Sequence, residues 1–97
     1  MNPHVEFREL VKLFIKNYKE SFVKSKVNNP VFTIEYVTLD DFVISIIGNY
    51  VVVAHKSSSQ PIWTSTGGFT GVNWEPCLNT LRRQLILDQL AEVTSIK

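Results

Sequence analysis

The sequence predicts an α+β domain in which an antiparallel meander of five to six strands lies between an N-terminal and a C-terminal helix. Three observations predict it: apolar residues recur with a helical period up to Asn28, the period changes to two at residue 31, and the helical period returns near residue 80. A meander with one apolar face is not stable alone in water. We therefore expect a two-layer sandwich in which both helices pack on one face of the sheet.

The first predicted helix begins near Pro3, a residue that suits the first helical turn. Glu6 and Glu9 follow where the helix dipole favours negative charge. Asn28-Asn29-Pro30 ends the helix, because a residue before proline avoids the α region. The apolar positions have the spacing of one buried face, and they are Phe7, Leu10, Val11, Phe14, Ile15, Tyr18 and Phe22.

Five short segments have the alternation of β-strands, at residues 31–37, 42–47, 50–54, 61–66 and 69–74. Turn signals separate them at Thr38 to Asp41, Gly48-Asn49, Lys56 to Gln60 and Gly67-Gly68. Connections this short favour antiparallel neighbours. Glu75-Pro76-Cys77 then interrupts the pattern. Thr80 is the predicted N-cap of a last helix with apolar residues at Leu81, Leu85, Ile86 and Leu90.

Length and composition limit the class of protein. With 97 residues, 44% hydrophobic and 20% charged, the chain has the composition of one globular domain, residues 1–97. No apolar run approaches the ~18 residues of a membrane span, so we expect no membrane association. A single cysteine, Cys77, excludes an internal disulfide and a multi-cysteine metal cage. No secretory or transit segment is recognisable at the N-terminus, so we expect a chain that stays where it is made or has lost a targeting peptide.

Charge is uneven along the chain, although its formal net value is +1. Residues 1–26 carry six Lys or Arg against three Glu, a net charge of +3. Lys12, Lys16 and Lys19 fall on one stripe of the first helix, which could follow a nucleic-acid backbone. A solvated lysine face is the commoner use of such a stripe, and the sheet carries no RNP-like aromatic pattern. We therefore do not expect a nucleic-acid partner.

Residues with catalytic chemistry are few. The only histidines are His4 and His55, Cys77 has no base beside it in sequence, and no glycine-rich loop could hold a phosphate. Glu6 with Glu9, and Asp40 with Asp41, could hold a hard cation loosely. The same residues are also favoured at a helix start and in a turn when no metal is bound. The residues therefore give little support to nucleophilic catalysis or to a nucleotide-dependent enzyme.

Trp63 is the most informative single residue. Alternation in its strand sets Trp63 on the face opposite to Ile62 and Thr64, and the spacing leaves open whether that face meets the helices or the solvent. On the open face, a large aromatic would be a hot spot for a protein partner. On the helix face, it would belong to the core.

Three segments resemble the frataxin family. These are Tyr50-Val51-Val52-Val53 through Gln60-Pro61-Ile62-Trp63-Thr64-Ser65, then Phe69-Thr70-Gly71-Val72-Asn73-Trp74, and then Thr80-Leu81 with Leu85. The order of elements along nearly the whole chain is also similar to that of frataxins. The resemblance implies an accessory protein of iron–sulfur cluster assembly, although frataxins are sometimes assigned ferroxidase activity. Its partners would be a cysteine desulfurase and an iron–sulfur scaffold protein, and the free chain would be a monomer.

The resemblance also implies particular residues and places. The partner-binding residues would be Trp63 on the open sheet face, with Gln60, Lys56 and Asn73. Weak Fe²⁺ binding would fall to the acidic residues Glu6, Glu9, Glu35, Asp40 and Asp41. The location would be the mitochondrial or mitosomal matrix, or the bacterial cytoplasm. The alternative is an unrelated α+β interaction domain that binds protein or nucleic acid through its sheet or its lysine-rich first helix.

Overall fold

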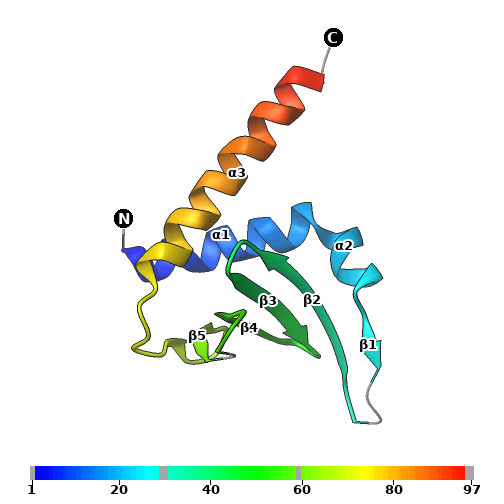
Figure 1. Ribbon diagram of the computed structural model, residues 1–97, viewed down its shortest axis with the longest axis vertical. Helices are drawn as coiled ribbons and strands as arrows, with labels where there is room; N and C mark the ends of the chain where they lie inside the picture. Colours follow the sequence, from blue (N-terminus) through cyan, green and yellow to red (C-terminus); the bar gives the residue numbers. More distant parts are fainter. Residues whose placement is uncertain (1, 29–30, 59, 96–97) are drawn as a thin grey trace.

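A computed structural model describes residues 2–28, 31–58 and 60–95 of the chain and confirms the α+β class. Helices lie at both ends, and an antiparallel sheet lies between them (Figure 1). In chain order the elements are α1 (Pro3–Asn17), α2 (Lys19–Lys24), β1 (Val27–Asn28), β2 (Thr33–Leu39), β3 (Phe42–Ile47), β4 (Tyr50–His55), β5 (Pro61–Thr64), β6 (Gly68–Phe69) and α3 (Glu75–Ser95).

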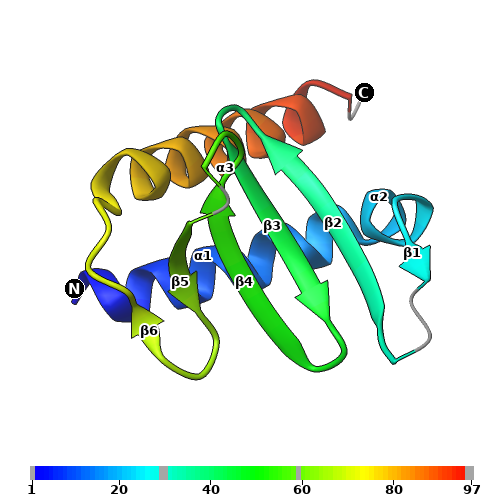
Figure 2. The same cartoon turned by 60° about the horizontal axis from the view of Figure 1, so that its bottom comes forward.

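Each strand pairs with its neighbours in the chain, so the spatial order is β1-β2-β3-β4-β5-β6. All five pairings are antiparallel. In Figure 2 one face of the sheet is turned toward the viewer, and α1 and α3 lie behind the strands. The two helices begin at the same end of the molecule. The C-terminal part of α3 extends beyond the sheet (Figure 1).

The start of α1 agrees with the sequence prediction. The Asn2 side chain caps the helix by accepting a hydrogen bond of 2.8 Å from the His4 backbone nitrogen, and Pro3 occupies the first turn. The predicted single helix is wrong in one respect, because it breaks at Tyr18 into α1 and α2. Tyr18 leaves the helical conformation at φ −112° and ψ 25°. Asn29 and Pro30, predicted to end the helix, lie outside the described residues.

Several strand limits differ from those predicted. The short strand β1 was not predicted, and β2 begins at Thr33 instead of residue 31. The strand β5 stops at Thr64, because the Thr64 hydroxyl accepts a hydrogen bond of 2.9 Å from the Gly67 nitrogen and closes a turn. The strand β6 is only two residues long, and Gly71 soon turns the chain away with a φ of +95°.

The last helix begins at Glu75, five residues before the predicted N-cap, Thr80. The Glu75-Pro76-Cys77 segment forms its first turn. Proline suits this position, because the backbone N–H that it lacks would have no partner in the first turn of a helix. Thr80 lies inside the helix, and its hydroxyl donates a hydrogen bond of 2.9 Å to the Pro76 carbonyl. The prediction of Thr80 as the N-cap is therefore wrong.

One hydrophobic core joins α1, α2, the sheet and α3. Its buried members are Phe7, Val11, Phe14, Phe22, Leu39, Phe42, Ile44, Val53, Ile62, Trp63, Cys77, Leu78, Leu81 and Leu85. The Phe7 ring lies 5.5 Å from the Trp63 ring and 5.1 Å from the Phe69 ring, measured between centroids. These ring contacts attach α1 to β5 and β6.

Trp63 belongs to this core, with 2% of its surface exposed, so its expected place on the open sheet face is wrong. Across the sheet it is aligned with Val53, which is fully buried. The pairing of β4 with β5 shifts between Val53 and Ala54, so that Val53 opposes Trp63 while Ala54 opposes Pro61. This β-bulge allows both Ile62 and Trp63 to be buried, which strict alternation would not.

Candidate protein-interaction site

The strand register divides the sheet into two faces. One row across the sheet, Val37, Ile44, Val53, Trp63 and Phe69, belongs to the core or packs against it. The residues between these positions point to the opposite face, because side chains alternate along a strand. On β2, β3 and β4 that outer face consists of Ile34, Tyr36, Thr38, Val43, Ser45, Ile47, Tyr50, Val52 and Ala54.

The outer face is unusually apolar for a surface that no described helix covers in Figure 2. An antiparallel sheet with one solvated face normally carries polar side chains there. Here Ser45 and Thr38 are the polar residues of β2 to β4 on that face, whereas Ile34, Val43, Ile47 and Val52 are apolar. Tyr36, on the same face, is 38% exposed. Neighbouring strands leave Val52 half-buried. Exposed apolar patches on monomeric proteins commonly mark interaction sites.

The other predicted partner-binding residues are exposed. Lys56 and Gln60 lie in the loop between β4 and β5, and Asn73 lies in the connection from β6 to α3. The loop is held to the β2–β3 turn, because the Lys56 nitrogen donates a hydrogen bond of 2.8 Å to the Asp41 carbonyl. Trp63 does not join them at the surface.

The predicted metal ligands are dispersed. Among the residues described, no group of three or more His, Cys, Asp or Glu side chains comes together. Glu6 instead accepts two hydrogen bonds of 2.6 Å from Arg82, and Asp40 accepts one of 2.6 Å from Arg83. Glu9 lies 3.8 Å from Lys12. Glu35 lies on β2, and Asp41 lies in the following turn.

Of these three ion pairs, Glu6–Arg82 is the one joined by two hydrogen bonds. The hydrogen bonds from Arg82 lower the pKa of the Glu6 carboxyl, and those to Glu6 raise the pKa of Arg82. Glu6 is therefore a partner of α3 in this structure. The sequence could not show this pairing, because the two residues are 76 positions apart.

A small pocket lies beside the β2–β3 turn and is lined by Asp41, His55, Lys56 and Ser57. These residue types could serve nucleophilic catalysis if they were hydrogen-bonded in series. No hydrogen bond joins the side chains of Asp41, His55 and Ser57 in the described structure. The His55 ring packs instead on the Phe42 ring at a centroid distance of 5.0 Å. The pocket has no triad geometry.

Cys77 is buried, with 1% of its surface exposed. Burial raises the pKa of its thiol to about 12. Since the thiolate is the reactive form, burial of this thiol disfavours a role as a nucleophile. The result agrees with its interpretation from the sequence as a packing residue.

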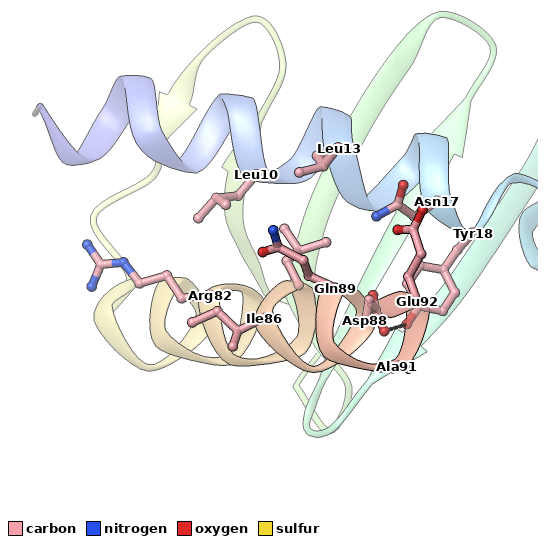
Figure 3. A pocket seen from close by; sticks show the side chains of 11 residues that line it. Leu10, Leu13, Asn17, Tyr18, Arg82, Ile86, Asp88, Gln89, Ala91 and Glu92 are labelled. Carbon is pink, nitrogen blue, oxygen red and sulfur yellow. Dashed lines mark hydrogen bonds between the residues drawn. The ribbon is translucent and has the colours of Figure 1, made fainter. Parts of the chain in front are cut away.

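Sequence reasoning missed a groove of about 800 Å³ between α1 and α3 (Figure 3). The side chains of Leu10, Leu13 and Asn17 enter it from α1, and those of Gln89 and Glu92 enter it from α3. The apolar residues Leu85 and Ile86 were visible in the sequence, but nothing in it places α3 beside α1.

Comparisons with protein-family models, curated proteins and solved structures find no match to this chain. In the part of the chain that the structure describes, no helix has the length and apolar character to cross a membrane.

Proposed function

We propose that the chain is a frataxin-like accessory protein that binds a cysteine desulfurase–scaffold complex through the outer face of its sheet. In this proposal the helices and the sheet form a two-layer sandwich, and the outer face is the free surface of the second layer. In this proposal the protein acts by binding. Its site of action is the mitochondrial or mitosomal matrix, or the bacterial cytoplasm.

The observation that carries the proposal is the apolar outer face. Tyr36, Val52 and Ile47 occupy positions that a solvated antiparallel sheet would fill with polar residues. Aromatic and branched side chains on a flat surface provide contact area at low entropic cost. The order of elements expected from the frataxin resemblance, helix, meander and helix, also supports it.

Three of the exposed polar residues remain in the proposed contact, namely Lys56, Gln60 and Asn73. Trp63 does not, because its ring is enclosed by the core. The partner surface of this protein therefore differs from the tryptophan-centred one that the resemblance implies. Ferrous iron, if carried as cargo, would be bound weakly, since the five predicted acidic ligands do not assemble into one site.

The test is binding of the whole chain to a purified, immobilised desulfurase–scaffold complex. Val52→Asp places a charge in the middle of the outer face, and we expect it to weaken binding by at least tenfold. Tyr36→Ala should weaken binding less, because it only removes contact area. The matched control is Val23→Asp, at a position of α2 that is 53% exposed; α2 packs into the core through Phe22, on the other side of the sheet (Figure 2).

The proposal fails if the wild-type chain does not bind the complex, or if Val52→Asp binds as the control does while remaining folded by circular dichroism. The alternative partner is a nucleic acid that binds the exposed Lys12, Lys16 and Lys19. The dependence of the affinity on salt concentration distinguishes the two partners. Binding to phosphates weakens steeply between about 50 and 200 mM salt. Contact through an apolar face does not.

A further inference from the structure

We propose that the groove between α1 and α3 is a docking site for an amphipathic helix of a partner protein, and that this helix carries a basic residue at one end. The site is separate from the outer face of the sheet, so it does not depend on the function proposed above. Its walls are two helices that come from opposite ends of the chain.

The groove has a closed end and an open end. At the closed end, Arg82 of α3 is bonded to Glu6 of α1 through two hydrogen bonds of 2.6 Å. From there the lining runs along α1 through Leu10 and Leu13 to Asn17 and along α3 through Ile86 to Glu92 (Figure 3). The open end lies where α3 extends beyond the sheet (Figure 1).

The middle of the groove is apolar and accessible. Leu13 is 44% exposed and Ile86 is 57% exposed, while Leu10 and Leu85 lie deeper. Exposed aliphatic side chains such as Leu13 and Ile86 around one depression are typical of a surface that buries a partner.

The dimensions favour a helix as the occupant. The α3 lining extends from residue 82 to residue 92, which corresponds to about 15 Å at 1.5 Å per residue. This length matches about three turns of a second helix. Helices bind such grooves through apolar anchors at positions i, i+3 or i+4, and i+7.

The acidic residue at one end of the groove favours a basic residue on the partner helix. At the open end the lining includes the carboxylate of Asp88, whereas Arg82, at the other end, is bonded to Glu6. One oxygen of Asp88, Oδ1, accepts hydrogen bonds of 2.6 Å from the Tyr18 hydroxyl and 2.9 Å from Gln84 Nε2. Its other oxygen, Oδ2, is buried and has no hydrogen-bond partner. An Arg or Lys from the partner would complement this acidic end.

The experiment is selection of binders from a displayed library of 16-residue helix-forming peptides against the whole chain, with counter-selection against the Leu13→Asp, Ile86→Asp double variant. We expect the enriched peptides to share apolar residues at i, i+3 or i+4, and i+7, followed by Arg or Lys. A synthetic peptide of that pattern should bind Leu13→Asp or Ile86→Asp at least tenfold more weakly than it binds the wild-type chain.

Two charge variants test the orientation. Asp88→Asn keeps the acceptor oxygen for Tyr18 and Gln84 but removes the charge, and we expect it to weaken the peptide several-fold. Replacing the basic residue of the peptide by Gln should have the same effect, and the two changes together should not add. Glu20→Gln, an acidic position of α2 outside the groove, is the control and should change nothing.

Several results would overturn the proposal. These are the absence of enriched peptides, enriched peptides without a basic residue, and binding that Leu13→Asp and Ile86→Asp leave unchanged while circular dichroism shows them folded. Self-association of the wild-type chain that Ile86→Asp abolishes would assign the groove to a second copy instead. Val52→Asp, which tests the sheet face, should leave peptide binding intact, so the two proposals can fail separately.

Discussion

The Trp63 indole lies in the core against Phe7, and its Nε1 has no hydrogen-bond partner. We expect Trp63→Ala to lower the free energy of unfolding by about 3–5 kcal/mol, the range for a buried aromatic replaced by alanine. Trp63→Phe should cost less, because it keeps most of the contact and removes an unpaired donor. Urea unfolding measures both.

The same variants test whether Trp63 is a binding residue. Affinity for the desulfurase–scaffold complex, corrected for the folded fraction, should not change in Trp63→Phe. If Trp63→Ala instead remained as stable as the wild type and bound the complex more weakly, Trp63 would be an exposed binding residue and not a core residue.

Cys77 gives a prediction for alkaline pH. Its thiol pKa is about 12 in the folded chain, against an ordinary value of 9.0 in the unfolded chain. Between these values the unfolded state releases a proton that the folded state keeps, so the stability falls as the pH rises from about 9 to about 12. The slope from this one group approaches about 1.4 kcal/mol per pH unit.

The matched variant is Cys77→Ala. It should be less stable at pH 8, because it leaves a cavity. Its stability should nevertheless fall less steeply between pH 9 and pH 11 than that of the wild type. Tyr18, whose pKa is also raised by burial and by Asp88, contributes equally to both proteins. Parallel slopes would show that the thiol does not titrate in this way.

Individual core residues could be predicted only where the period was regular. Phe7, Val11 and Phe14 have helical spacing, and all three are buried. Trp63 could not be placed, because the β-bulge beside Val53 arises from strand pairing and leaves no mark in the alternation of β5.

At the scale of elements, the turn from β5 to β6 is fixed by Gly68. Its φ is +73°, and a Cβ atom there would lie 2.6 Å from Cε1 of His4 on α1. We expect Gly68→Ala to destabilise the protein by more than the ~1–2 kcal/mol of the backbone conformation alone.

Gly48 is the natural comparison for Gly68. Its φ is +63°, and nothing lies within 4 Å of an added Cβ atom. Gly48→Ala should therefore show only the backbone effect in thermal unfolding. If the two variants are equally destabilised, His4 moves aside without cost, and the packing of α1 on this turn is loose.

The type and order of the elements could be predicted, whereas several boundaries could not. The β2–β3 and β3–β4 turns lie where Asp40-Asp41 and Gly48-Asn49 indicated them. The predicted start of α3 was wrong, because a proline such as Pro76 is found both where a helix is interrupted and in the first turn of a helix. The strand β1 exists by pairing with β2, which its own composition does not reveal.

For the whole molecule, the distribution of charge predicts weak binding of ferrous iron. Glu6 and Asp40 are held by Arg82 and Arg83, and residues 1–26 carry a net charge of +3. Titration calorimetry should show no tight saturable site. The Glu6→Ala, Glu9→Ala double variant should give the same weak signal, and tight binding that this variant abolishes would contradict the prediction.

Neither of the two proposed interaction surfaces could be located from the sequence. Strand pairing decides which residues share a face of the sheet, and packing against α1 decides which face remains uncovered. The groove joins residues 10–18 to residues 82–92, and no sequence period connects them.

The contact between α1 and the far end of the sheet also sets an order of events during synthesis. Strands β1 to β4 pair with chain neighbours and can associate as they leave the ribosome. The helix α1 emerges first, yet Phe7 packs on Trp63 and Phe69, and Glu6 meets Arg82 only 76 residues later. The N-terminal part of its apolar face is therefore made well before the strands that cover it, and exposed apolar surface on a nascent chain promotes aggregation.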